Sequence, residues 1–397
     1  MIMSLLPPPS EKPLNLIAFA FLLIAFLTGI ASSFQQPTLS LFLSQEIHAS
    51  PFMVGLFYSA NAIIGILLSQ LIAAYSDKQE DRRKVIMICC LLSIIGCVIF
   101  AYCRNYWILI ILGTTLLGLG SASNPQSFAL AREYTESAGK ESVMFTTIMR
   151  TQISLAWIVG PPLSFAIALN WGFSYMYLVA GAAFLLCALA TICLLPKISR
   201  NLAKTQQSGE IIEAPRTQRK STAFLFADCL LCWMCNSMYF INMPLYLIHQ
   251  LHLPEQLAGI LMGTAAGLEI PVMLLAGYLT RFLSKKQLMF TALFCGGLFY
   301  IGLSVVQQTW MLIALQGLNA IFIGIIATIG MVYFQDLMPR QMGAATTLFS
   351  NTAKSSWIIG GPVAGFIAEF WHYNSVFYVS ILILLVAAFC LHKVKSV

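Results

Sequence analysis

The sequence predicts an all-α membrane protein with twelve transmembrane helices in two six-helix bundles. Two observations lead to this fold class. Apolar residues make up 59% of the 397 residues and charged residues only 9%, whereas charged residues form about a quarter of a soluble domain. The apolar residues are also grouped into runs of about 20, the length that a helix needs to cross the hydrocarbon core of a bilayer.

Charged or turn-rich breaks separate twelve such runs along the chain. The predicted spans are 14–36, 53–75, 85–103, 106–127, 143–168, 173–195, 222–247, 256–279, 287–305, 309–334, 344–368 and 374–391. The first span is expected to stay in the protein rather than be cleaved as a signal peptide. Its apolar run is longer than a signal sequence uses, and "MIMSLLPPPSEKP" before it carries no net positive charge.

Lysine and arginine residues predict how these spans are oriented. Nineteen of the 22 lie at the termini or in even-numbered connections, and Arg104 alone lies in an odd-numbered one. Arg150 and Lys354 fall inside spans. Because cytoplasmic loops carry the excess of positive charge, both termini are predicted to be cytoplasmic. Topology and contact with the lipid bilayer thus account for the net charge of +7, and no nucleic-acid partner is expected.

A polar segment divides the chain into two halves of six spans each. It reads "PKISRNLAKTQQSGEIIEAPRTQRKS" and contains Pro, Gly and a cluster of basic residues, as a linker does. The predicted domains are therefore an N-terminal bundle at 1–195, a cytoplasmic linker at 196–221 and a C-terminal bundle at 222–397.

The two halves repeat one another. "TTIMRTQISLAWIVGPPLSFAIALNW" at 146–171 aligns without gaps on "TTLFSNTAKSSWIIGGPVAGFIAEFW" at 346–371, an offset of 200. Two tryptophans and a Gly-x-Pro recur in register. Because the offset covers an even number of helices, the copies share one orientation, which is the parallel pseudo-two-fold repeat of the major facilitator fold.

The connection "AAYSDKQEDRRK" at 73–84 resembles the loop between the second and third spans of major facilitator transporters. Lys78 replaces the usual arginine and an acidic residue stands at the glycine position. The resemblance implies a cytoplasmic latch or gating element that includes Asp77, Arg82 and Arg83. The alternative is that these charges only set the topology.

Longer motifs resemble the bacterial sugar efflux transporter family. They are "QPTLSLFLSQEI" at 36–47, "GLFYSANAI" at 55–63, "FALAREY" at 128–134, "MRTQISLAWIVGPPL" at 149–163, "GTAAGLEIP" at 263–271 and "FQDLMPRQMGAATTLF" at 334–349. The resemblance covers nearly the whole chain outside the first dozen residues and the linker. It implies export of sugars and glycosides, such as glucose, lactose or thiogalactosides, across the inner membrane in exchange for protons. "AWIVGPPLS" at 156–164 resembles the Gly-Pro motif of proton antiporters but lacks the glycine pair that usually follows.

Proton coupling requires a titratable group inside the membrane, and four residues within spans qualify. They are Arg150, Asp228, Glu269 and Lys354. From the rise of 1.5 Å per residue, Arg150 lies roughly 10 Å from the cytoplasmic side and Glu269 roughly 20 Å from the periplasmic side, so their depths nearly coincide. We hypothesise that Glu269 pairs with Arg150 in one access state and takes a proton in another, with Lys354 as an alternative partner. The competing interpretation is a static ion pair. Asp228 is a weaker coupling candidate or a gating residue.

A sugar presents hydroxyls and an apolar ring face, so its site should combine amides with aromatic planes. The candidate substrate-binding residues are Gln36, Tyr58, Asn61, Asn124, Gln152, Trp157, Asn236, Tyr239, Asn319 and Trp357. Polar residues in spans also serve as contacts between helices, and this alternative applies to each of them.

Other classes of function are expected less. A multidrug and proton antiporter of the same fold is the main alternative, although its cavity should hold fewer amides. No phosphate-binding loop and no nucleophile–base constellation appears, so neither an ATPase nor another enzyme is expected. "CLLCWMC" at 229–235 has the spacing of a metal site but no further ligands, so neither a metal nor a cofactor is expected. The chain is expected to act as a monomer.

Overall fold

The computed structural model describes residues 14–76, 78–79, 81–137, 142–197, 216–338 and 342–395. These ranges contain α-helices and two short π-helical segments, and no strand occurs in them. The all-helical part of the predicted fold class is therefore confirmed.

The first six predicted spans correspond to α1 (Leu14–Gln45), α2 (Pro51–Ser76), α3 (Arg82–Tyr102), a broken segment, α7 (Ser142–Trp171) and α8 (Phe173–Cys193). The next six correspond to α9 (Arg216–His249), α10 (Gln256–Leu279), α11 (Lys285–Val305), a second broken segment, α14 (Met342–Phe370) and α15 (Ser375–Lys393). Several helices are longer than the predicted spans. Helix α1 continues through Pro37, because a transmembrane helix tolerates a proline where neighbouring groups satisfy the freed backbone.

Each broken segment contains one π-helical turn. The first consists of α4 (Tyr106–Ile108), η1 (Leu109–Gly113), α5 (Thr114–Ser121) and α6 (Ser123–Ser137). The second consists of α12 (Thr309–Ile325), η3 (Ile326–Gly330) and α13 (Met331–Leu337). Single π-helical turns often bend a helix, and here each one lies inside a predicted span.

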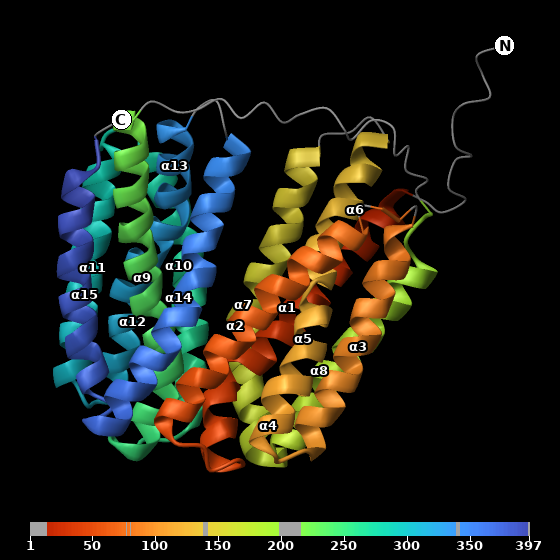
Figure 1. The fold of residues 1–397 in the computed structure, drawn as a ribbon, viewed down its shortest axis with the longest axis horizontal. Helices are drawn as coiled ribbons and strands as arrows, with labels where there is room; N and C mark the ends of the chain where they lie inside the picture. Colours follow the sequence, from red (N-terminus) through yellow and green to blue (C-terminus); the bar gives the residue numbers. More distant parts are fainter. Residues whose placement is uncertain are drawn as a thin grey trace. The chain divides into compact units, whose positions relative to one another are not determined.

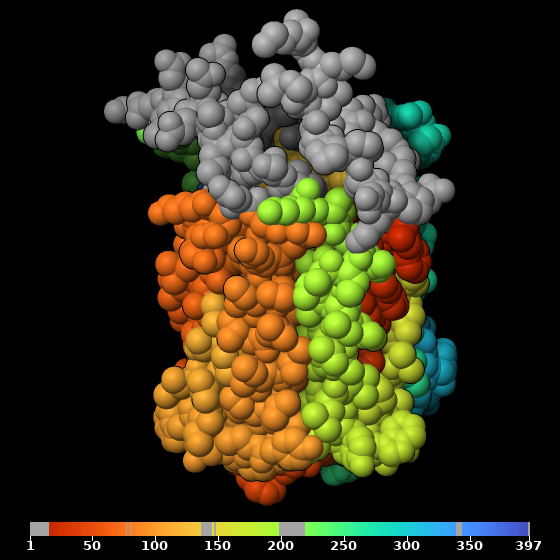
Figure 2. Space-filling view, turned by 90° about the vertical axis from the view of Figure 1, so that its right-hand side faces the viewer, coloured from red at the N-terminus to blue at the C-terminus, as the bar shows by residue number. Residues whose placement is uncertain are grey.

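Eleven of the helical segments in the described residues are long and apolar enough to cross a membrane. Helix α14, which contains Lys354, is the predicted span that is not among them. The surface supports membrane insertion: α3 and α8 lie side by side on one face (Figure 2) and expose large apolar side chains such as Ile95 and Leu186. In a membrane protein, exposed apolar side chains on such a face contact the lipid chains.

The described residues pack into two compact units (Figure 1). The first contains the described parts of Met1–Gln35, Ile64–Trp157 and Trp171–Glu210. The second contains Gln36–Ile63, Ile158–Asn170 and the described part of Ile211–Val397. Packing and sequence repetition are different properties, so the domain boundary at the linker remains a prediction from the repeat.

In the first unit, α3 is the central helix and packs against α8, α5 and α6. In the second unit, α9 packs against α14 and α15, α11 against α12 and α15, and α10 against α12. Figure 1 shows this group of helices with α9 in front of α12. Small residues allow close approach at several of these contacts, as is usual where lipid tails leave little hydrophobic drive between helices.

Gly120 provides one such close contact, since a Cβ atom there would lie 1.2 Å from Ser93 Oγ and 2.5 Å from Ser93 Cβ on α3. We expect Gly120→Ala to destabilise the fold by about 1–3 kcal/mol, because the added methyl group overpacks the contact. The measured effect is a lower apparent Tm in detergent. Gly65→Ala in the same unit is the matched control, because nothing lies within 4 Å of its added Cβ. Equal Tm values for the two variants would contradict the packing described for α3 and α5.

Candidate functional site

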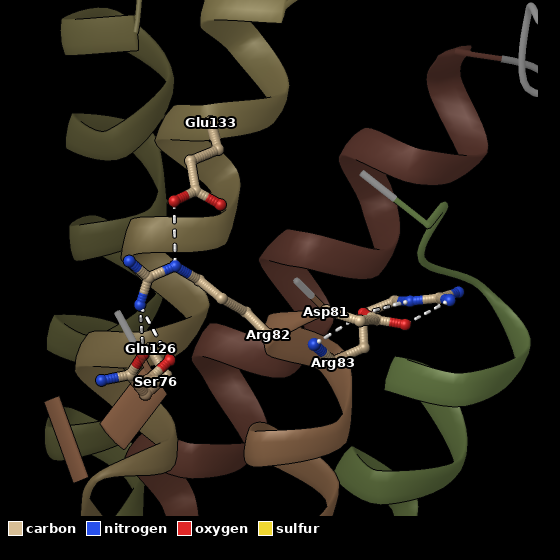
Figure 3. Close-up of polar contacts among 6 residues, drawn as sticks. All are labelled: Ser76, Asp81, Arg82, Arg83, Gln126 and Glu133. Carbon is tan, nitrogen blue, oxygen red and sulfur yellow. Dashed lines mark hydrogen bonds and ion pairs between the residues drawn. The ribbon is translucent and has the colours of Figure 1, made fainter. Parts of the chain in front are cut away.

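A buried arginine joins three helices at the start of α3. Arg82 is 7% exposed in its side chain, and its Nε donates to Glu133 Oε1 on α6 at 2.9 Å (Figure 3). Its Nη1 donates to Ser76 Oγ at the end of α2 and to Gln126 Oε1 on α6. The guanidinium thus ties α2, α3 and α6 together at one end of the first unit, with bonds whose charge strengthens them.

The neighbouring arginine makes a separate network. Arg83 binds Asp81 through Nε and Nη2 at 3.0 and 2.8 Å (Figure 3). Its Nη1 donates to Leu195 O just beyond α8. Asp81 also caps α3 by accepting from the Arg83 backbone. Burial acts to raise the pKa of Asp81, but the hydrogen bonds and charge of Arg83 outweigh it and hold that pKa below its usual value. The predicted latch residue Asp77 lies outside the described residues.

The second unit repeats this arrangement at an offset of 203. Ser284 caps α11 in the place of Asp81, and Lys285 forms an ion pair with Asp336 as Arg82 does with Glu133. Lys286 donates to His392 O and Val394 O at the end of α15, as Arg83 donates to Leu195 O beyond α8. Side-chain identity is lost between the two loops, so only the spacing could have indicated these contacts from the sequence.

The predicted coupling residues are not bonded to one another. Glu269 lies on α10 and is partly buried, whereas Arg150 on α7 and Lys354 on α14 are exposed. Within the described ranges the side chain of Glu269 makes no hydrogen bond and no ion pair, and Lys354, which belongs to the same unit, does not reach it. The backbone of Glu269 contacts α12, where a Cβ on Gly324 would lie 3.4 Å from Glu269 O.

Asp228 occupies a different environment from Glu269. It is 0% exposed in the core of the second unit, and Cys232 Sγ lies 3.9 Å from its Oδ1. Its Oδ2 has no hydrogen-bond partner among the described residues. The carboxyl group of Asp228 therefore has no direct contact with solvent in this conformation. In the described residues no group of three His, Cys, Asp or Glu side chains is placed to hold a metal.

The candidate amides fall into two groups. Five of them are partly buried and have side chains without a hydrogen bond in the part of the chain that the structure describes. These are Gln36, Asn61, Asn124, Gln152 and Asn236.

Asn319 and Tyr239 belong to a buried network instead. Tyr239 Oη and Asn319 Nδ2 both donate to Gln316 Oε1, at 3.2 and 3.1 Å. This network joins α9 to α12 in the core of the second unit. Contact between helices therefore accounts for these two side chains, while Asn319 Oδ1 has no partner among the described residues.

Three aromatic rings pack together in the second unit, and we call them the aromatic triad: Tyr58, Phe240 and Trp357. Tyr58 stacks on Trp357 with ring centroids 5.7 Å apart and planes at 18°. Phe240 meets the same indole edge-on at 5.6 Å and 79°. Tyr58 Oη donates to Gln36 O at 2.9 Å, which fixes the phenol against α1. No sequence pattern distinguishes Phe240 from the other phenylalanines among the 27 in the chain.

Unpartnered polar side chains lie next to the aromatic triad. Asn61 follows Tyr58 by one turn on α2, and Asn236 and Lys354 precede Phe240 and Trp357 by one turn on α9 and α14. Helix α2 runs antiparallel to α14 where they touch, as the contacts of Gly55 with Gly361 and of Gly365 with Pro51 show. Helix α9 runs parallel to α14, as the bonds from Ser237 to Ser356 O and from Asn242 to Tyr373 O show. All three polar side chains therefore lie on the same side of the triad, about 4.5–6 Å along the helix axes. Trp157 lies in the first unit.

Comparison with known proteins identifies the chain. The family model of the Major Facilitator Superfamily matches residues 21–309 and 271–395, so the chain is a member of that superfamily and a multi-pass membrane protein. It is 54% identical to sugar efflux transporter A of Dickeya chrysanthemi, over 96% of this chain and 97% of the relative. It is 50% identical to sugar efflux transporter B of Salmonella typhimurium and 48% identical to sugar efflux transporter C of Escherichia coli, over 98% of each chain. The chain belongs to the sugar efflux transporter family, as its motifs predicted.

Solved structures confirm the predicted fold. The nucleoside transporter NupG superposes with a TM-score of 0.80 at 16% identity, over 95% of this chain and 98% of that one. A bacterial homologue of the human lysosomal transporter Spinster superposes with a TM-score of 0.77 at 12% identity, over 95% and 96%. At these identities the likeness concerns the fold alone.

We expect Arg82→Ala to destabilise the first unit, because Glu133, which is mostly buried, would lose its ion pair with the Arg82 guanidinium. Breaking a buried pair costs 3–5 kcal/mol, and the 23% exposure of Glu133 reduces this to about 2 kcal/mol. Lys84→Ala is the control, since Lys84 is exposed on the same turn of α3. Apparent Tm in detergent measures both, and a loss of the same size in Lys84→Ala would argue against a specific role for the Arg82 contacts.

Proposed function

We propose that the chain exports sugars or glycosides across the bacterial inner membrane in exchange for protons, by alternating access. The observation that carries this proposal is the aromatic triad with Asn61, Asn236 and Lys354 beside it. A sugar ring has an apolar face that stacks on an aromatic plane and hydroxyls that need amide or ammonium partners. The names of the relatives, all sugar efflux transporters, support the same substrate class.

The unpartnered amides favour a sugar over a hydrophobic drug. The five side chains are partly buried and have no partner among the described residues, so their amides are open to hydrogen bonds with a polar solute. A multidrug and proton antiporter is the alternative for this fold. It would be favoured if the amides proved dispensable and the triad alone determined affinity.

For energy coupling we propose that Glu269 exchanges a cationic neighbour for a proton between access states. Its support is that Glu269 lies in an apolar helix, is partly buried and lacks a partner among the described residues. An intramembrane carboxylate of this kind is costly unless it is paired or protonated, which is why such groups often mark coupling sites. Arg150 and Lys354 are the proposed partners in other states, because each is an exposed cation within a predicted span.

The orientation follows from the positive-inside rule, with both termini in the cytoplasm. On this orientation the Arg82 and Lys285 ion pairs lie at the cytoplasmic side, and the loop at 46–50 lies at the periplasmic side. The proposed direction of net transport is outward. A single chain contains the triad and all proposed coupling groups, so we propose a monomer as the transporting unit.

The decisive experiment is counterflow in vesicles that contain the purified full chain. Vesicles are loaded with unlabelled solute and then exposed to labelled glucose, lactose or a thiogalactoside, with a labelled cationic dye as the drug-like control. We expect transient accumulation of at least one sugar and none of the dye. Accumulation of the dye without any sugar would reject the proposed substrate class in favour of the multidrug alternative.

Asn61→Ala should raise the half-saturation concentration for the sugar about tenfold, because a solute hydroxyl then loses its partner inside the site. Asn170→Ala is the matched control. The Asn170 side chain is exposed and donates to Ala166 O of its own helix at 2.8 Å. An unchanged half-saturation concentration in Asn61→Ala would remove Asn61 from the site.

Glu269→Gln should abolish sugar export driven by a pH gradient, because the amide cannot exchange a proton, while counterflow without a gradient continues. Glu255→Gln, at the start of the same helix, is the control and should export at the normal rate. Normal gradient-driven export by Glu269→Gln would show that Glu269 is a structural residue.

A further inference from the structure

Two pairs of helices in the second unit touch backbone to backbone. Along α2 and α14, a Cβ on Gly55 would lie 2.1 Å from Gly361 O, and a Cβ on Gly365 would lie 2.4 Å from Pro51 O. We call this contact the α2–α14 seam. No side chain larger than hydrogen fits at these positions, so the two helices are in direct contact over at least one turn.

The second contact is formed by α7 and α10. A Cβ on Gly259 would lie 2.8 Å from Pro161 O, and one on Gly263 would lie 2.8 Å from Ile158 O. We call this contact the α7–α10 seam. In both seams a glycine of one helix meets the backbone of the Gly-x-Pro region of the other.

The two seams are copies of one another within the internal repeat. The offset of 200 that relates α7 to α14 places Pro161 on Gly361 and Ile158 on Ile358. An offset of 204 relates α2 to α10 and places Gly55 on Gly259 and Ser59 on Gly263. The two seams therefore share their backbone geometry. Any difference in how strongly the helices are held together must come from the side chains that differ between the seams.

At the equivalent positions compared in the described residues, polar side chains join the helices in the α2–α14 seam and have no counterpart in the α7–α10 seam. In the α2–α14 seam, Ser59 Oγ donates to Ile358 O. The α7–α10 seam has Gly263 at that place, which has no hydroxyl. At the outer end of the α2–α14 seam stands Glu369, and its counterpart on α7 is Leu169.

Glu369 reaches across the seam to the beginning of α2. Its Oε2 accepts from Ser50 Oγ at 2.7 Å and from the Phe52 backbone N at 2.8 Å. Phe52 is in the first turn of α2, where backbone N–H groups have no partner within the helix. A carboxylate there gains both a hydrogen bond and a favourable interaction with the helix dipole. The bond from Gln45 to Glu255 at the same end joins α1 to α10 and belongs to neither seam.

We infer that the hydrogen bonds of Glu369 hold the α2–α14 seam closed, and we call this carboxylate the lock of that seam. The α7–α10 seam has Leu169 at the equivalent position and no such lock, so it separates more readily. Opening of this end of the second unit then requires the carboxylate to leave the first turn of α2. The inference rests on the geometry of the two seams and on membership of the superfamily, and it depends neither on the solute nor on proton coupling.

A cysteine behind the seam reports its opening. Ala62→Cys places a thiol one turn inward from Ser59 on the same stripe of α2, in a background where the exposed Cys193 is replaced by serine. The full chain is reconstituted in vesicles without solute. A membrane-impermeant thiol reagent is then added from the side of the loop at 46–50, and the rate of labelling is measured against the same protein without the sensor.

We expect Glu369→Gln and Glu369→Asp each to raise the labelling rate, on the order of tenfold for the loss of a helix cap. Glu369→Gln keeps the length of the side chain and removes its charge. Glu369→Asp keeps the charge and shortens the side chain by one methylene group. Leu169→Ala, at the equivalent position of the α7–α10 seam, should label at the rate of the parent protein. The apparent Tm of each variant is measured to show that the fold is retained.

Parental labelling rates in both Glu369 variants would overturn the inference. An equal acceleration in Leu169→Ala would overturn it too, because the two seams would then be equally locked. Failure of the sugar counterflow experiment leaves this test unaffected, since no solute is present when labelling is measured.

Discussion

The free energy that it costs to bury a charge without a partner determines where charged side chains lie in this protein. Arg82, with 7% of its side chain exposed, is tolerated because Glu133, Ser76 and Gln126 take up its donors. Lys285 and Asp336 do the same in the second unit. Charges at helix ends can find such partners or water, whereas charges within apolar helices find few. Glu269 and Asp228 are carboxyl groups in the described ranges that depart from this pattern, because the side chain of Glu269 and the Oδ2 atom of Asp228 have no hydrogen-bond partner there.

The internal repeat shows which features the fold requires and which are specific. A cap on the third helix of each half, an ion pair to the fourth and a basic residue on the carbonyls after the sixth all occur twice, although the residues differ. Features that occur twice with changed side chains are structural requirements. Features that occur once, such as the aromatic triad and the carboxylate of Glu369, break the symmetry and are candidates for a directional process.

The sequence predicted the helices and the repeat because both depend on local composition and spacing. Runs of apolar residues determine spans, and the gap-free alignment of 146–171 on 346–371 needs no structure. Helix ends were less predictable, since Pro37 does not end α1. Contacts between distant residues could not be predicted: Asn319 and Tyr239 were candidates either for solute binding or for contact between helices, and their bonds to Gln316 are seen only in the structure. Glu369 was not among the candidate residues, although its replacement by Leu169 at the equivalent position of the repeat is visible in the sequence.

The proposed solute site and the lock share one pair of helices. Tyr58 and Trp357 stack where α2 and α14 meet at their inner end, and Ser50 and Glu369 meet at the outer end. The glycine contacts lie between these two points and make the helix pair nearly rigid over that length. A sugar ring that took the place of Tyr58 on the indole face would remove the innermost contact of the same seam. Solute binding would then weaken the seam at its inner end, while the Ser59 hydrogen bond, the glycine contacts and the carboxylate of Glu369 would still hold the rest of it closed.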